Sequence, residues 1–299
     1  MASARDIQRR RRSVKNVAKV TGALQTVAAS RVRRAQSQAL ATRAYANAAM
    51  DILNDIAAHT SGEATHRLLD PRAEIKAIGV VLITSDRGLA GPYNSNVVRT
   101  AYDFEKKQTA PVRFITVGRK GRDLMLRRGS NIVAEFSDLP PVPSIMDITA
   151  ITRLAVDEFD KHSVDEVYLI YTRFINMLRQ DPIVQRLLPL QPIKVTERKS
   201  AMQTGSSVAA GAVFTYEPDP EAILNEILPR FTELQLFQAL LESLASEHSA
   251  RMVAMRNATE NANGLVDELT LAYNKARQLA ITSEILDIVG GAEALKASG

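Results

Sequence analysis

The sequence has no cysteine and no tryptophan, and aromatic residues make up only 5% of its 299 positions. The lack of Cys excludes a disulfide framework, a thiolate metal site and a thiol switch, and is compatible with a reducing compartment. Four histidines occur without the spacing of metal ligands, so no metal site is expected: His59, His66, His162 and His248. Few aromatics beside 45% apolar residues favour helices packed through Ala and Leu over a sandwich or barrel.

Long apolar runs are also missing. No stretch approaches the roughly 18 residues of a membrane span. The start of the chain, MASARDIQRRRRSVK, is basic but lacks the apolar segment and cleavage site of a secretory signal. We therefore expect no direct membrane span, and any membrane to be reached through another protein.

Acidic residues are almost absent from one end of the chain. Residues 1–50 hold eleven Lys/Arg and only Asp6 as an acid, whereas residues 201–299 hold six Lys/Arg and thirteen Asp/Glu. Opposite charges favour pairing of the two ends, or a different partner for each. The clusters RRRR (9–12) and RVRR (31–34) fit a solvated helix face, an acidic protein surface or, less well without aromatics nearby, nucleic acid.

Two terminal segments have helical periodicity. Residues 2–57 contain no Pro and one Gly, and a helix of about 55 residues would be about 80 Å long. Its apolar or small stripe is Ile7, Val14, Val17, Thr21, Leu24, Ala28, Ala35, Thr42, Tyr45, Ala49, Ile52 and Ile56. A second helix is predicted to begin at Asp219-Pro220-Glu221, with Asp219 as its N-cap and a kink near Pro229, and to run to about Leu295.

The second helix has a stripe with steps of three or four, averaging near the 3.5 residues of a left-handed coiled coil. Its members are Ile227, Phe231, Leu234, Phe237, Leu241, Leu244, His248, Met252, Met255, Ala258, Ala262, Leu265, Leu269, Ala272, Ala276 and Leu279. Both helices exceed what one globular core needs. We expect them to pack against each other.

The middle of the chain has a different pattern. Three apolar runs of strand length, 75–84, 112–117 and 164–174, alternate with helical segments and predict a parallel sheet. A polar loop at 199–211 and a short extended piece, VFTYEP, would follow. The predicted fold class is α/β plus long coiled coil: antiparallel N- and C-terminal helices form a shaft that carries an inserted Rossmann-like α/β domain. The predicted domains are 1–60, 74–198 and 212–299.

No catalytic constellation is present, and the carboxylates of the α/β region are scattered. SDRGLAGPYN (85–94) lies between a strand and a helix, where Gly88 and Gly91 would let backbone amides approach an anion. It matches neither a Walker loop nor the dinucleotide fingerprint. A tight turn that requires glycine is the simpler interpretation.

The last helical segment, RQLAITSEILDIVGGAEAL, is apolar on several faces. Near the end of a two-helix rod the chain offers little to bury these side chains, so a partner is expected to surround them. A segment folded back on its own chain is the alternative. The residues assigned to this tip are Ile281, Ile285, Leu286 and Ile288.

Several motifs resemble the gamma subunit of F-type ATP synthase, in order along nearly the whole chain. ITSEILDIVGGAEA (281–294) is similar to the C-terminal signature through Thr282, Glu284, Asp287, Gly291 and Ala292. VAASRVRRAQ (27–36) and LITSDRGLAG (82–91), with Ala90 where Cys is common, also match. So do the segment RFINMLRQDPIVQRLLPL (173–190), interpreted as a loop, and FTYEPDP (214–220).

The resemblance implies a rotor shaft that couples proton flow through the membrane ring to ATP synthesis on the β subunits, with no catalysis and no cofactor of its own. Implied partners are the α and β subunits, the epsilon subunit and the c-ring, at the cytoplasmic face of the plasma membrane. By position, the β-subunit contacts would be Leu24, Arg251, Arg277, Gln278, Thr282 and Glu284. Plant-type members carry a thiol-regulated insertion that is missing here, so redox control is not expected.

One polar run stands inside the second helix: Asn257, Thr259, Asn261 and Asn263. Such side chains compete for backbone hydrogen bonds and are mediocre in helix interiors. Our hypothesis is that they form a shaft face that is wetted or gripped in turn. A coiled-coil scaffold and a basic nucleic-acid-binding protein remain the alternatives from other classes.

Overall fold

The computed structural model describes residues 4–59, 66–190 and 220–297, without the side chains of residues 40, 43–59, 220–223 and 293–297. The predicted loop at 199–211, the extended piece at 213–218 and the proposed N-cap Asp219 lie outside the described residues. The chain divides into two compact units, Met1–Ser30 with Arg251–Gly299 and Arg31–Ala250. Each unit is described by itself.

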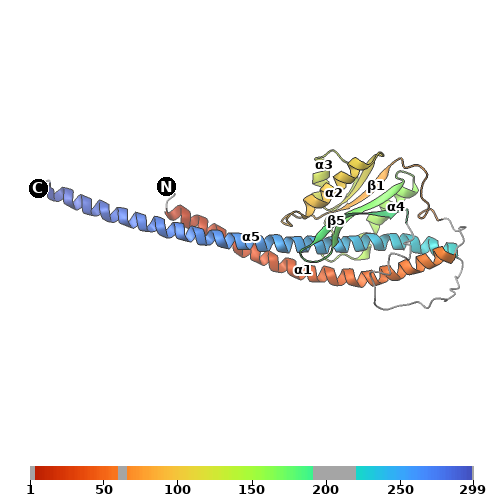
Figure 1. The fold of residues 1–299 in the computed structure, drawn as a ribbon, viewed down its shortest axis with the longest axis horizontal. Helices are drawn as coiled ribbons and strands as arrows, with labels where there is room; N and C mark the ends of the chain where they lie inside the picture. The colour runs from red at the N-terminus through yellow and green to blue at the C-terminus, as the bar shows by residue number, and fades with distance from the viewer. Residues whose placement is uncertain (1–3, 60–65, 191–219, 298–299) are drawn as a thin grey trace. The chain divides into compact units, whose positions relative to one another are not determined.

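The two long helices are present. Helix α1 spans Ala4–His59 and helix α5 spans Pro220–Ala297, with Pro229 inside it (Figure 1). Both lengths agree with the periodicity, and α5 begins at the predicted proline.

The second unit contains a five-stranded mixed sheet in the order β3-β2-β1-β4-β5. Strands β1, β2 and β4 confirm the predicted ones, and β1–β2, β1–β4 and β2–β3 pair in parallel. The elements are β1 (Ile78–Ile83), α2 (Tyr93–Lys107), β2 (Val112–Val117), α3 (Arg119–Leu126), β3 (Asn131–Phe136), the 3-10 turn Ile145–Asp147, α4 (Thr149–Asp160), β4 (Glu166–Phe174) and β5 (Gln180–Leu188).

The expectation of a loop over 173–190 is wrong. Half of this segment is strand β5, which pairs antiparallel with β4 through a hairpin. Pro182 is tolerated because β5 is an edge strand, where a missing N–H can face away from the ladder. The sheet is therefore mixed and not all parallel.

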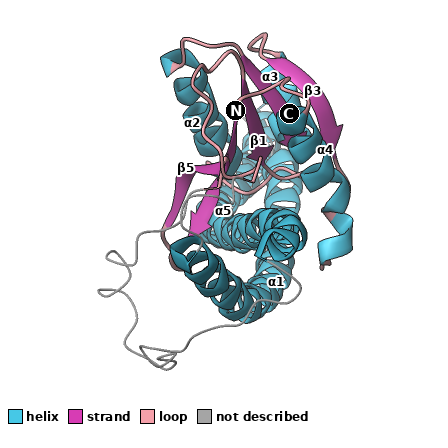
Figure 2. Cartoon of the chain, turned by 90° about the vertical axis from the view of Figure 1, so that its right-hand side faces the viewer, coloured by secondary structure: helices cyan, strands magenta, loops and turns pink. Residues whose placement is uncertain are grey.

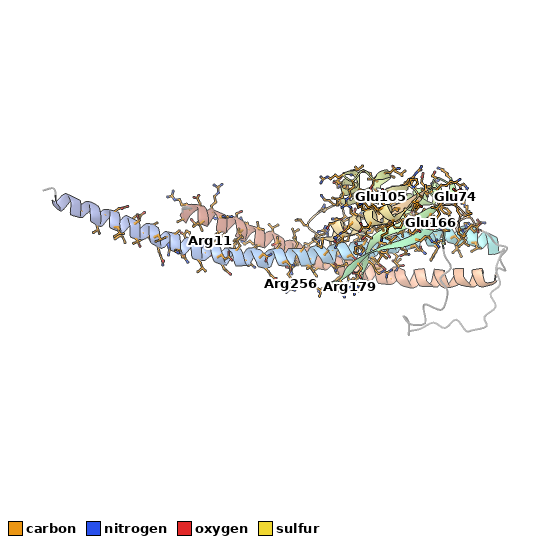
Figure 3. All side chains as sticks on the ribbon, turned by 45° about the horizontal axis from the view of Figure 1, so that its top comes forward. Arg11, Glu74, Glu105, Glu166, Arg179 and Arg256 are labelled. Carbon is orange, nitrogen blue, oxygen red and sulfur yellow. The ribbon has the colours of Figure 1, made fainter. Side chains whose placement is uncertain are left out.

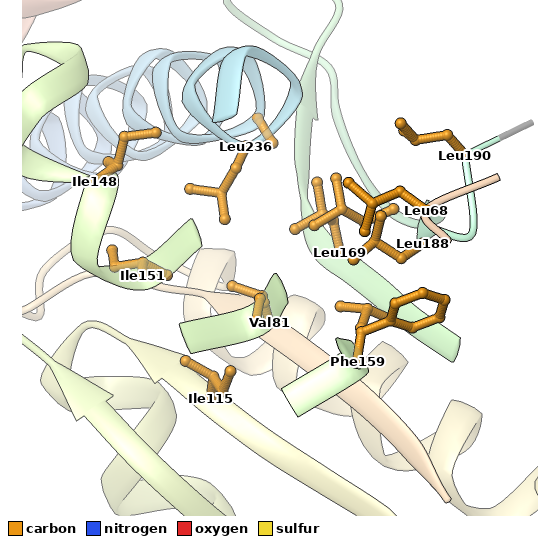
Figure 4. Close-up of a cluster of buried hydrophobic side chains, with 14 of the residues drawn as sticks. Leu68, Val81, Ile115, Ile148, Ile151, Phe159, Leu169, Leu188, Leu190 and Leu236 are labelled. Carbon is orange, nitrogen blue, oxygen red and sulfur yellow. The ribbon is translucent and has the colours of Figure 1, made fainter. Parts of the chain in front are cut away.

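Helices cover both faces of the sheet (Figure 2). On one face, α2 and α3 pack through Val97, Val98 and Met125 against β1 and β2. On the other, α4 and the first part of α5 bury a larger cluster, in which Leu236 of α5 lies with Ile148 and Ile151 (Figure 4). Because β1 is central and covered on both sides, all six of its residues are buried.

Within the first unit, the start of α1 contacts α5 in antiparallel order. The Thr259 hydroxyl lies 2.7 Å from that of Thr21, and the Arg11 guanidinium lies 5.1 Å from the centre of the Tyr273 ring. The later α1 residue meets the earlier α5 residue, as expected for the predicted coil.

The buried stripe of α1 differs in detail from the predicted one. Thr21, Ala28 and Ala35 are buried, but Val17 is 51% exposed, and Ala18 is buried instead. Tyr45, Ala49, Ile52 and Ile56 lie outside the described side chains. The small buried residues allow a close approach of the partner helix.

Candidate contact site on the C-terminal helix

Four of the predicted contact residues lie together near the end of α5. Arg277, Gln278, Thr282 and Glu284 are all exposed, and the Thr282 hydroxyl donates to the Gln278 carbonyl at 2.9 Å. That bond is internal to the helix and leaves the other polar groups facing outward.

Helical geometry places these four residues on one side. At about 100° per residue, they fall within roughly half of the helix circumference. Ile281, Ile285 and Ile288 fall inside the same sector and are 48%, 55% and 72% exposed, whereas Leu286 lies outside it and is 65% exposed. The arrangement can combine apolar contact with charged hydrogen bonds on one face.

The exposure of this segment has a simple cause. Arg11 of α1 lies over Tyr273, and only a few α1 residues precede Arg11, back to Ala4 (Figure 3). Because the two helices are antiparallel, the N-terminal end of α1 at Ala4 lies opposite the region around Ala280 of α5. Every described side chain from Ile281 to Ala292 is exposed.

Leu24 and Arg251 are not part of this group. Both are partly exposed and belong to the same unit as Arg277. Arg251 lies about 40 Å from Arg277 along the helix, at 1.5 Å per residue. If all six residues contact a partner, they do so at two positions separated along the axis of α5.

The polar run in α5 divides between two faces. Thr259 points toward α1 and bonds Thr21, and Ala262 is buried, whereas Asn257, Asn261 and Asn263 are exposed. At about 100° per residue, Asn257 and Asn261 share a side away from Thr259, whereas Asn263 lies on the same side as Thr259. The hypothesis of a gripped face stays a prediction for Asn257 and Asn261, and Thr259 is corrected to a helix–helix contact.

The glycine-containing loop after β1 forms a compact turn. Gly91 has φ 53°, and the Ser85 N–H donates to the Asn94 side chain at 3.1 Å. The Asp86 carboxylate accepts the N–H groups of Arg119 and Asp138, both at 3.0 Å. The Ser85 and Tyr93 amides of the loop itself already donate to the Asn94 side chain and the Ala90 carbonyl, so the geometry favours the tight turn over an anion site.

Sequence reasoning missed a polar cluster on α5. Glu242, Ser243, Ser246, Glu247, His248 and Ser249 are all buried. The run SEHS on an otherwise apolar stripe was the available signal. In the part of the chain that the structure describes, no group of three or more His, Asp or Glu could hold a metal ion, and no helix is long and apolar enough to cross a membrane.

A sequence model of the ATP synthase family matches residues 3–295. The ATP synthase gamma chain of Herpetosiphon aurantiacus is 45% identical over 304 residues, and that of Roseiflexus castenholzii is 44% identical over 300 residues. Each alignment covers 99% of both chains.

Solved structures have a similar fold. A chain of the Euglena gracilis mitochondrial ATP synthase, in its OSCP/F1/c-ring structure, has a TM-score of 0.68 at 21% identity and covers 99% of this chain and 95% of its own. A chain of the Tetrahymena thermophila mitochondrial ATP synthase, in its central stalk and c-ring structure, has a TM-score of 0.58 at 25% identity. The match covers 80% of this chain and 99% of the Tetrahymena chain. With two long terminal helices around a mixed sheet and full-length relatives above 40% identity, this chain belongs to the ATP synthase gamma chain family.

Proposed function

We propose that this gamma chain is the central rotor shaft of a proton-translocating ATP synthase and is itself non-catalytic. The exposed end of α5 carries the proposal most directly. Residues Ile281 to Ala292 extend past the start of α1 with every described side chain exposed, although the segment contains isoleucines that favour burial. A surrounding partner explains that composition.

The partners we propose are the α and β subunits around the exposed end, and the epsilon subunit and c-ring at the foot. Residues 1–60 and 212–299 would be the shaft helices, and residues 74–198 the foot domain. The complex would work at the cytoplasmic face of the plasma membrane, with this subunit peripheral to it. ATP chemistry would take place on β.

A rotor must make contacts that form and break in each turn. Arg277, Gln278 and Glu284 present polar groups on one side, and a charged hydrogen bond is worth about 1.5–3 kcal/mol. A few such bonds can favour one state of a β subunit without holding the shaft permanently. A uniform apolar collar would not distinguish one orientation from another.

The first test is to tag this chain, extract it gently from membranes, and identify and count its partners. We expect larger nucleotide-binding subunits in threefold excess, with magnesium-dependent ATP hydrolysis. A chain that purifies alone, or with nucleic acid, would contradict the proposal.

The contact residues are tested by Glu284→Gln, with Glu268→Gln as the matched control. Both carboxylates are exposed on α5, but at about 100° per residue Glu268 faces the side opposite Arg277. Glu284→Gln should lower ATP-driven proton pumping by up to about tenfold, the equivalent of roughly 1.4 kcal/mol. Equal pumping by both variants would refute the assignment of Glu284.

A further inference from the structure

The buried polar residues of α5 have a defined place in the second unit. Two of them bond the α/β domain: the Tyr93 and Ser243 hydroxyl oxygens lie 2.6 Å apart, and the Ser246 hydroxyl donates to the Thr172 carbonyl at 3.0 Å. Tyr93 is 4% exposed and Ser246 is fully buried. These are long-range contacts between a shaft helix and the sheet domain.

Both contacts lie at the carboxyl ends of the sheet strands. Thr172 is near the carboxyl end of β4, and Tyr93 starts α2 after β1. Strands β1 and β4 are neighbours, with β2 and β3 on one side and β5 on the other, so the strand order reverses between them. In open α/β sheets this is where ligands usually bind. Here the Ser243 and Ser246 hydroxyls of α5 bond the Tyr93 hydroxyl and the Thr172 carbonyl at that position.

The loop after β1 fixes the position of Tyr93. The Ser85 hydroxyl lies 2.6 Å from the Arg87 carbonyl, the Asn94 side chain bonds Ser85, and the Tyr93 N–H donates to the Ala90 carbonyl at 3.2 Å. The glycine-containing turn thus acts as a rigid support that presents the phenol hydroxyl to α5.

We propose that Tyr93–Ser243 and Ser246–Thr172 form a torque-bearing joint that fixes the rotational setting of α5 about its axis relative to the α/β domain. The proposal rests on the rotor function proposed above. Turning force that enters through the foot would pass to the shaft helix at this joint. Tyr93 and Ser246 are positioning residues.

Stability alone does not account for the polar composition. The neighbouring α5 residues Leu228, Phe231 and Leu240 already pack into the main core. Within the described part of the chain, the buried hydroxyls of Thr172 and Ser249 make no hydrogen bond, which apolar side chains of the same size would avoid. Apolar packing is non-directional, whereas hydrogen bonds depend on angle and resist rotation of the helix.

The test uses the assembled complex, held by its catalytic head, with a bead on a single cysteine introduced by Lys107→Cys at the exposed end of α2. The chain has no other cysteine, so the label is unique within it. The measured quantity is the angular variance of the bead during pauses in ATP-driven rotation. Variants are Tyr93→Phe, which keeps the ring, and Tyr93→Phe with Ser246→Ala.

Thr232→Val is the matched control. Thr232 is a fully buried hydroxyl on the same helix, but it donates to the Leu228 carbonyl of its own helix at 2.9 Å. We expect the variance to increase in Tyr93→Phe, to increase further in the double variant, and to stay at the parental value in Thr232→Val.

Unchanged variance in both joint variants, or an equal increase in Thr232→Val, would overturn the joint while leaving the rotor function intact, since rotation is still observed. A parental complex that hydrolyses ATP without bead rotation would instead overturn the proposed function.

Discussion

A buried ion pair connects the segment before β1 to the start of β4. Arg72 bonds the Asp165 carboxylate at 2.9 Å and the Val164 carbonyl at 3.1 Å, and stacks on the Phe159 ring at 4.4 Å. The other Asp165 oxygen accepts the N–H groups of Lys76 at 2.6 Å and Ala77 at 3.1 Å. The carboxylate therefore bonds the segment before β1 at two places and ties it to the start of β4.

We predict that Asp165→Asn destabilises the second unit by about 3 kcal/mol at pH 7, because it leaves the largely buried Arg72 charge without its counter-ion. In a unit of this size the melting temperature should fall by about 6–12 °C. Thermal unfolding of the purified chain, followed by circular dichroism, measures the difference.

The effect should depend on pH. Burial alone would raise the pKa of the Asp165 carboxyl, but the Arg72 bond and the two backbone N–H groups outweigh it and hold the pKa below its usual range. Since the folded pKa is the lower one, the stabilisation is complete above about pH 4 and is lost as pH falls through the folded pKa. The difference in melting temperature between the parent and Asp165→Asn should be constant from about pH 5 to 8 and become smaller in more acidic solution.

The pair Arg179–Asp181 provides the control. It has the same 2.9 Å separation, but its side chains are 69% and 39% exposed. Asp181→Asn should change the melting temperature little, because solvent screens an exposed pair. Equal losses from both substitutions, or a pH-independent gap at position 165, would refute the argument from burial.

Three further outcomes follow from the structure. Gly118→Ala should lower the free energy of unfolding, measured by chemical denaturation, by roughly 3 kcal/mol, because φ is +97° and a Cβ would lie 2.4 Å from the Thr84 carbonyl oxygen. Gly129→Ala, at φ +77° in open space, should lower it by only about 1 kcal/mol. In a double-mutant cycle, Thr259→Val should lower the free energy of unfolding by about 1 kcal/mol, and adding Thr21→Val should restore most of that stability. Asn257→Ala with Asn261→Ala should slightly raise helix stability by circular dichroism but change ATP-driven rotation or coupling; unaltered rotation and coupling would refute the gripped-face hypothesis.

The long helices and the central strands could be predicted because each carries a sustained pattern. A period near 3.5 over the last third of the chain is typical of a long helix that packs along one stripe, and β1 is a continuous apolar run because both its faces are covered. Edge strand β3, NIVAEF, is as long as β1 but alternates exposed and half-buried residues, so it lacks the continuous apolar run that marks a central strand. In β5, Pro182 resembles a loop signal, although an edge strand accepts it.

Only part of the site could be predicted, since sequence periodicity shows which helix face a residue occupies but not what lies opposite. The apolar faces of the last helical segment predicted that the chain itself would leave Ile281 and its neighbours unburied. The residue at which this exposure begins depends on the offset of the two helices and required the structure. The joint was hidden for the same reason: Tyr93 and Ser243 are 150 residues apart, and Thr172 and Ser246 are 74 apart.

Two stretches of α5 depart from the same rule. Periodicity assumes apolar side chains inside and polar ones outside, yet around Ser246 the polar groups are buried, and around Ile285 the apolar groups are exposed. Each departure is unfavourable for the isolated chain, the first through desolvation and the second through exposed apolar area. Local rules fail most often where a site serves something other than its own stability. A helix that departs from them around Ser246, where it bonds the α/β domain, and again around Ile285 fits the proposed role of a shaft on which forces act at two places.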